Sequence, residues 1–249
     1  MSTLHVVRHA QASMFAANYD ALSDQGRGQA RRLGQVWAER LVAGERPGFD
    51  AVFTGPAARH RDTAALVGEG FAAAGLGFPA TIEIAGFDEH DGQGLVREVL
   101  VRVGRGERGL LGDRPELFEH AAVALDTRRD RGERARSWQL LYEAIMQRWL
   151  ADELVVDGIE RWPEFRDRVG AAFAELRERA RGEVALFTSV GPTAVILYQV
   201  LELTPRVAFE QAWRLLNTGV TRVVYSGARA TLDGYNDASH LPLHDWTHR

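Results

Sequence analysis

Short apolar runs alternate along the chain with longer segments whose apolar residues recur every three or four positions. Five of these runs are typical of buried strands: Leu4–Val7, Ala51–Phe53, Ile82–Ile84, Val184–Phe187 and Val220–Tyr225. Between the first two, Ala30, Leu33, Trp37 and Leu41 form the apolar face of a helix. Ser23 is placed to cap that helix. This alternation of strands and helices predicts a parallel sheet covered on both faces.

The region from Gly86 to Gly182 departs from this alternation. It shows no convincing strand, and its apolar residues recur at helical spacing, as in Leu141, Ile145 and Trp149. A segment of this length is too long for a simple loop inside a compact domain. We therefore expect a single domain over residues 1–249 with a helical insertion at about 86–182, which acts as a cap.

Composition excludes several kinds of chemistry. The 249 residues contain no cysteine and no lysine, and the 30 basic side chains, all arginine, nearly balance 34 acidic ones. Disulfides, thiolate metal sites, Schiff bases and the lysine of phosphate-binding loops are therefore excluded. The charge balance predicts no nucleic-acid partner, and neither a signal peptide nor a membrane-spanning run is recognisable. We expect a cytoplasmic protein without a membrane partner.

Polar residues follow four of the predicted strands. Arg8-His9 comes after the first strand, Arg59 after the second, Glu89 after the third and Ser189 after the fourth. The carboxyl ends of parallel strands meet at one edge of a sheet, where ligands bind. Helices predicted to begin at Pro56 and Pro192 would direct N–H groups to the same edge. Because arginine pairs with phosphate oxygens, the pattern predicts a phosphate site.

In such a site His9 has two possible roles, as a nucleophile or as a general acid–base. A nearby carboxyl group, Glu89 or Asp91, would supply a proton to the leaving oxygen. A lone histidine elsewhere is more often structural than catalytic, and His90, beside the carboxyl groups, is left undecided. The histidines for which no catalytic role is expected are His5, His60, His120, His244 and His248.

Several segments resemble, in order, those of the histidine phosphatase superfamily, the phosphoglycerate mutase-like proteins. The segments are Arg8-His9-Ala10-Gln11, Leu22-Ser23-Asp24-Gln25-Gly26, Phe49 through Arg59 with Thr63-Ala64, and Asn236 through Leu241. The resemblance implies a three-layer α/β/α fold with a mostly parallel central sheet, and phosphoryl transfer without a metal or other cofactor. It implies His9 as the nucleophile, Glu89 as the general acid, and Arg8 and Arg59 as phosphate ligands. The last segment, with Asn236 and His240, is expected to be structural.

The chain departs from the family at two places. Where the family has a second histidine followed by glycine, this sequence has Ser189 and Val190. Ser189 is expected to bind phosphate, but the loss of a preorganised charged donor would cost about 3 kcal/mol, or roughly 10²–10³ in rate. The stretch Ser13-Met14-Phe15-Ala16 lacks the tryptophan–asparagine pair of the mutases.

We therefore expect a phosphoric monoester hydrolase acting on a small phosphorylated substrate through a phosphohistidine, with activity reduced by the loss of the second histidine. The alternatives are a catalytically weak phosphate-binding protein and, third, a phosphoglycerate mutase. A homodimer is left open.

Overall fold

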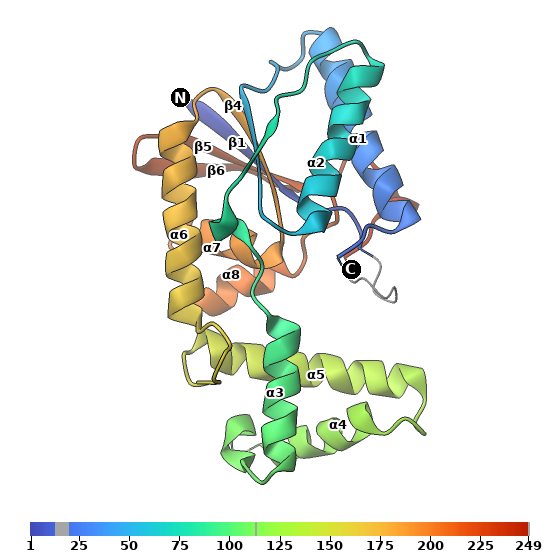
Figure 1. Cartoon of the computed structure of the whole chain (residues 1–249), viewed down its shortest axis with the longest axis vertical. Helices are drawn as coiled ribbons and strands as arrows, with labels where there is room; N and C mark the ends of the chain where they lie inside the picture. The colour runs from blue at the N-terminus through green and yellow to red at the C-terminus, as the bar shows by residue number, and fades with distance from the viewer. Residues whose placement is uncertain (13–19, 113, 249) are drawn as a thin grey trace. The chain divides into compact units, whose positions relative to one another are not determined.

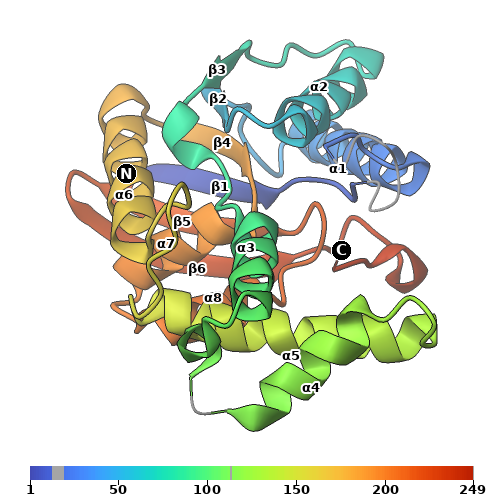
Figure 2. The same cartoon turned by 60° about the horizontal axis from the view of Figure 1, so that its bottom comes forward.

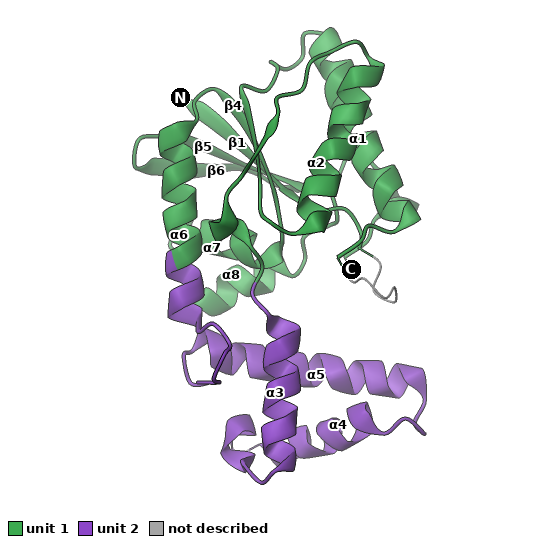
Figure 3. Cartoon of the chain, viewed as in Figure 1, with its two compact units in different colours: residues 1–89, 168–249 green, residues 90–167 purple. Residues whose placement is uncertain are grey.

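The computed structural model describes residues 1–12, 20–112 and 114–248. The chain divides into two compact units (Figure 3): residues 1–89 with 168–249, and residues 90–167. The stretch 13–16, in which the sequence lacks the mutase pair, lies outside the described residues.

The first unit is built on a six-stranded sheet in the order β3-β2-β4-β1-β5-β6. Its strands are β1 Ser2–Arg8, β2 Ala51–Thr54, β3 Thr81–Glu83, β4 Glu183–Thr188, β5 Val220–Ser226 and β6 Arg229–Asp237. β1 to β4 run parallel to one another, and β5 and β6 are added antiparallel. The mostly parallel sheet is therefore confirmed, and β1, β4 and β2 are neighbours at its centre.

Two strands differ from the prediction. β3 was expected to be buried, yet it is an edge strand whose three residues are exposed, with Ile82 36% exposed. β6 was not predicted, because its side chains alternate between exposed and half-buried and form no apolar run. Both differences lie at the edges of the sheet, where one side of the strand has no partner to bury it.

Helices α1 (Asp24–Val42) and α2 (Ala58–Ala73) cover one face of the sheet (Figure 1). The predicted stripe on α1 is confirmed, since Leu33 and Trp37 pack into a core with Val7 and Phe187 of the sheet. The predicted cap is also confirmed, because Ser23 Oγ accepts the Gly26 N–H at 3.0 Å.

Helix α7 (Val190–Val200) and the 168–179 part of α6 (Trp162–Arg179) lie on the opposite face of the sheet (Figures 1 and 2). Helix α8 (Pro205–Ala212) follows α7. Side chains that alternate with the first core, including Leu4, Phe53 and Leu186, are fully buried on this second side. The predicted three-layer α/β/α arrangement is thus confirmed.

The second unit is helical. It contains α3 (Gly92–Gly104), α4 (Pro115–Leu125) and α5 (Arg131–Leu150), and its described residues form no strand. The predicted stripe on α5 is buried, and Trp149 stacks on His90 with ring centroids 5.1 Å apart. This unit is shorter than the predicted insertion, because residues 86–89 and 168–182 belong to the first unit. Its action as a cap stays a prediction.

No helix among the described residues is both long enough and apolar enough to cross a lipid bilayer.

Candidate active site

His9 lies directly after the central strand β1, at the carboxyl edge of the sheet. Its backbone is fixed from two sides: its N–H donates to the Thr188 carbonyl at 2.8 Å, and the Asn217 side-chain amide donates to its carbonyl at 2.9 Å. These bonds connect His9 to β4 and to the turn before β5. The imidazole is therefore held at a defined place.

The ring of His9 is oriented by a short contact with its own backbone neighbour. Nδ1 lies 2.8 Å from the carbonyl oxygen of Ala10, so Nδ1 carries the proton and donates it there. Desolvation, followed by the nearby charges of Arg8 and Arg59, holds the pKa of His9 well below its usual value. The ring is neutral at neutral pH, and the lone pair of Nε2 is available as a nucleophile.

Arg59 stands in the first turn of α2. This helix begins at Ala58, two residues after the predicted start at Pro56, and α7 begins at Val190, before Pro192. The Arg59 side chain is 12% exposed, and its Nη1 donates to Asp20 Oδ1 at 2.8 Å. Arg59 is thus held close to His9, as its effect on the His9 pKa indicates.

Asp20 is a site residue that the sequence did not reveal. Its carboxylate accepts the Ala58 N–H at 2.6 Å as well as the Arg59 guanidinium. Although burial works in the other direction, these donors hold the pKa of Asp20 below its usual value. Asp20 therefore occupies donors of the kind that bind phosphate, at the amino end of a helix.

Arg8 is buried, with 7% of its surface exposed. Its guanidinium donates to the carbonyl of Leu215, and its charge is the second cause of the lowered His9 pKa. The Arg8 charge thus acts on the His9 ring, and the role of Arg8 as a phosphate ligand stays a prediction.

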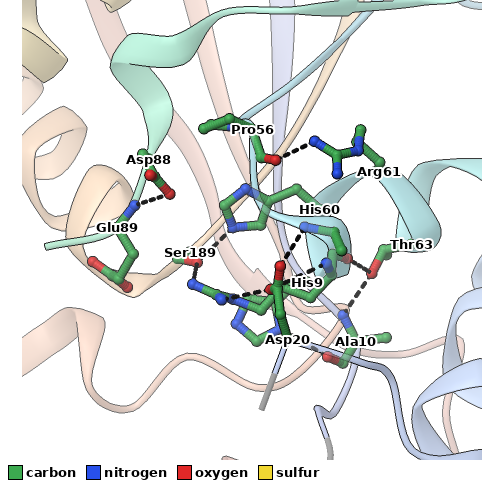
Figure 4. Close-up of polar contacts among 12 residues, drawn as sticks. His9, Ala10, Asp20, Pro56, His60, Arg61, Thr63, Asp88, Glu89 and Ser189 are labelled. Atoms are coloured by element: carbon green, nitrogen blue, oxygen red, sulfur yellow. Dashed lines mark hydrogen bonds and ion pairs between the residues drawn. The ribbon is translucent and has the colours of Figure 1, made fainter. Parts of the chain in front are cut away.

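Ser189 follows β4 and is almost fully buried. Its Oγ accepts a hydrogen bond from Arg59 Nη2 at 3.3 Å and lies 2.6 Å from His60 Nε2 (Figure 4). The predicted phosphate ligands Arg59 and Ser189 are thus brought together, even though 130 positions separate them.

His60 is the second residue that sequence reasoning missed. It was assigned no catalytic role, but its ring is fully buried in the site, 5.8 Å from the ring of His9. Burial, and then the charge of Arg59, lower its pKa to about 3, so the ring is neutral. The sequence did carry a signal: His60 directly follows the predicted phosphate ligand Arg59, in a chain that has no histidine at 189.

Glu89 reaches the amino end of α7. Both of its carboxylate oxygens lie 3.1 Å from the Gly191 nitrogen and accept its N–H. Asp91, the other candidate acid, belongs to the second unit and caps α3, where its Oδ1 accepts the Gly94 N–H at 2.7 Å. Glu89 therefore contacts the helix that follows Ser189, whereas Asp91 caps a helix of the second unit.

The remaining histidines that are described lie in other surroundings. His5 pairs with Glu183 at 2.7 Å, and His90 packs against Trp149 in the second unit. His240 bonds with the Thr218 hydroxyl at 2.9 Å, and burial lowers its pKa to about 4. Asn236 accepts the Leu216 N–H at 2.8 Å. The Asn236–His240 segment thus fixes the turn around Asn217, which holds the His9 backbone, as expected of a structural motif.

The described residues contain no group of three or more histidine or carboxylate side chains that could hold a metal ion.

Comparison with known proteins confirms the predicted resemblance. The model of the histidine phosphatase superfamily (branch 1) matches residues 119–238, just under half of the chain. The matched segment includes Ser189 and Asn236, whereas His9, Arg59 and Glu89 precede it. A search of curated protein sequences found no match.

Solved structures share the fold over nearly the whole chain. A phosphoglycerate mutase from Bacillus anthracis is 17% identical, with 96% of this chain and 94% of that one covered and a TM-score of 0.59. A phosphoserine phosphatase from Entamoeba histolytica is 16% identical, with 97% and 100% covered and a TM-score of 0.59. A mycobacterial glucosyl-3-phosphoglycerate phosphatase is 19% identical, with the same coverage and a TM-score of 0.59. The fold is therefore that of the phosphoglycerate mutase-like proteins.

Proposed function

We propose that this protein is a phosphoric monoester hydrolase that acts through a phosphohistidine on a small phosphorylated substrate. The observation that carries the proposal is the state of His9. Its ring is neutral, its Nδ1 proton is engaged by the Ala10 carbonyl, and a guanidinium group stands on the neighbouring turn. A neutral imidazole held in this way is an activated nucleophile for phosphorus.

In the first half-reaction, the lone pair of His9 Nε2 attacks phosphorus and forms an N–P bond. The bond between phosphorus and the leaving oxygen breaks, and the oxygen keeps the electron pair. The acid form of the Glu89 carboxyl group gives its proton to that oxygen, so that an alcohol leaves. The ring gains positive charge, which the Nδ1–H···O=C bond to Ala10 stabilises.

In the second half-reaction, a water molecule attacks the phosphoryl group. The N–P bond breaks, its electron pair returns to Nε2, and the Glu89 carboxylate takes the proton of the water. Inorganic phosphate leaves, and both side chains regain their starting states. We favour Glu89 over Asp91 because Glu89 reaches the amino end of α7, next to Ser189.

Arg8, Arg59 and Ser189 are proposed to hold the phosphate. Phosphoryl transfer depends chiefly on positioning and on electrostatic stabilisation of the equatorial oxygens. The two guanidinium groups supply positive charge close to His9, and Ser189 supplies a hydroxyl already fixed by Arg59. These are the groups that such a reaction needs.

Hydrolysis of an aryl phosphate tests the proposal directly. The purified protein is expected to hydrolyse the aryl phosphate, and His9→Ala is expected to abolish hydrolysis, because it removes the nitrogen that is proposed to attack phosphorus. His244→Ala is the matched control, since that histidine is exposed, with 81% of its side chain accessible. Equal turnover by wild type and His9→Ala would refute the proposal.

A catalytically weak phosphate-binding protein is the second candidate, favoured by the serine at position 189. It predicts tight binding of phosphate without turnover. A phosphoglycerate mutase is the third, because one structural neighbour has that activity. It would convert one phosphoglycerate isomer into another, whereas the hydrolase releases inorganic phosphate only.

A further inference from the structure

The hydroxyl of Ser189 has an unusual pair of neighbours. A serine hydroxyl can donate one proton and accept two hydrogen bonds. Arg59 Nη2 fills one acceptor position at 3.3 Å, and the second close contact is His60 Nε2 at 2.6 Å. All three groups are buried or nearly so.

We propose that His60 is a positioning residue that acts through Ser189 and compensates for the absence of a histidine in the turn after β4. The inference rests on the proposed phosphatase function and deepens it. In it, His60 donates its Nε2 proton to Ser189 Oγ. Both acceptor positions of the hydroxyl are then occupied, so its single proton is free to bond with an oxygen of the transferring phosphoryl group.

The charge state of His60 suits this role. A neutral ring can carry its one proton on Nε2, as the proposal requires, and donate it without adding a second buried cation beside Arg59. The positive charge that a second histidine would bring to the phosphoryl group is supplied by Arg59, which contacts the same serine. Two consecutive residues of α2 therefore fix one hydroxyl in the turn between β4 and α7.

The surroundings hold the His60 ring in place. The backbone N–H of His60 donates to the Ala57 carbonyl at 3.0 Å, which fixes the backbone from which the ring extends. Gly55 leaves room for the ring, because a Cβ at that position would lie 2.5 Å from His60 Nδ1. A donor held in this manner needs no reorganisation during the reaction, which is the condition for effective electrostatic stabilisation.

The test compares two variants of similar size. His60→Leu removes the donor, whereas His60→Gln keeps an N–H group that can reach Ser189. With an aryl phosphate, kcat is expected to fall about 10- to 100-fold in His60→Leu, with KM changed less than about threefold, and to stay within about fivefold of wild type in His60→Gln. Circular dichroism and thermal melting establish that each variant folds, and His244→Ala is the control.

Binding of orthovanadate and inorganic phosphate gives a readout that does not depend on turnover. Vanadate imitates the five-coordinate phosphorus of the transition state, so its Kd is expected to rise with the fall in kcat in His60→Leu, while the phosphate Kd changes less than about threefold. If wild type binds vanadate but does not turn over, the proposed function fails and the vanadate comparison still decides the role of His60.

Two results would overturn the inference. One is an unchanged vanadate Kd in a folded His60→Leu protein. The other is an equal loss in His60→Leu and His60→Gln, which would make His60 a packing residue only. If His60→Leu does not fold, Ser189→Ala is compared with His60→Gln instead, and wild-type vanadate affinity in Ser189→Ala would contradict the proposal.

Discussion

The turn after β2 and the turn after β4 lie side by side, because the two strands pair in parallel, yet they carry very different side chains. The first provides Arg59 and His60, and the second provides only the hydroxyl of Ser189. In the proposed arrangement, a hydrogen-bond donor needed beside the phosphoryl group can come from the turn after β2 as well as from the turn after β4. The position of the donor atom in the site is important for the proposed role, and the strand that precedes the donor residue is not.

The two turns are alike in one respect. Each is followed by a helix whose amino end donates a backbone N–H to a carboxylate from elsewhere in the chain: Ala58 donates to Asp20, and Gly191 donates to Glu89. The difference lies in what else each carboxylate touches. Asp20 also pairs with Arg59, whereas Glu89 is the proposed proton donor. If Arg59 binds phosphate as proposed, the phosphate competes with Asp20 for this guanidinium group.

Among changes to these two turns, removal of the Arg59 guanidinium group is expected to lower activity the most. Arg59→Ala should lower kcat/KM for an aryl phosphate about 10³-fold, because it removes charge-assisted bonds and one of the donors that fix Ser189. Arg61→Ala is the matched control, since Arg61 is half exposed and pairs with Glu83 at 3.1 Å. Steady-state kinetics measure both, and comparable losses in the two variants would place the phosphate elsewhere.

The Glu89→Gln variant tests whether Glu89, which contacts the amino end of the helix after β4, is the proton donor. We expect kcat to fall about 10²-fold for an alkyl phosphate and much less for a nitrophenyl phosphate, whose leaving group needs little protonation. Asp91→Asn should leave kcat within about threefold, because Asp91 caps α3. If the Asp91 variant loses more activity than the Glu89 variant, the two roles have been assigned the wrong way round.

Stability at acid pH probes the buried histidine of the β2 turn. His60 and His240 have folded pKa values of about 3 and about 4, against about 6.5 when unfolded. Below pH 6.5 the unfolded chain therefore binds protons that the folded chain does not, so the free energy of unfolding falls as the pH is lowered from 6.5 towards 4.

At 1.4 kcal/mol per pKa unit, His60 accounts for up to about 3 kcal/mol of this loss between pH 6.5 and 4.5. Urea denaturation of His60→Gln should show a loss of unfolding free energy between pH 6.5 and 4.5 that is smaller than the wild-type loss by up to about 3 kcal/mol, and His244→Ala should match wild type. Parallel curves for wild type and His60→Gln would mean that His60 is protonated in the folded protein.

The smallest effect is expected from Asp20→Asn. This variant keeps an oxygen acceptor for the Ala58 N–H but removes the charge that competes with phosphate for Arg59. Inorganic phosphate should bind about three- to tenfold more tightly at low salt, and the gain should shrink as salt is added. Weaker binding, measured by calorimetry, would show instead that Asp20 positions Arg59 for the ligand.

The sequence predicted the centre of the fold well, for physical reasons. Strands at the middle of a parallel sheet are buried on both faces, so they read as continuous apolar runs, as in Val184–Phe187. The cap at Ser23 and the stripe on α1 follow from local rules. β6 was not predicted, because an edge strand that is half exposed has no continuous apolar run.

Within the site, residue types at strand ends pointed to His9, Arg59 and Ser189, since the topology brings strand ends together. His60 and Asp20 were missed because their roles depend on partners far away in the chain, 129 positions for His60 and Ser189. Such pairs are set by the packing of α2 against its neighbours. The local sequence shows that His60 follows Arg59, but it does not identify Ser189 as the partner of His60.

The central claim is that His9 itself becomes phosphorylated, and trapping the intermediate tests it most directly. The protein is mixed with an excess of aryl phosphate, quenched at alkaline pH and analysed by peptide mass spectrometry. The account predicts one phosphoryl group on the peptide that contains His9, and none in the His9→Ala protein. Turnover with no phosphoryl group on that peptide, or with the group on another residue, would contradict it.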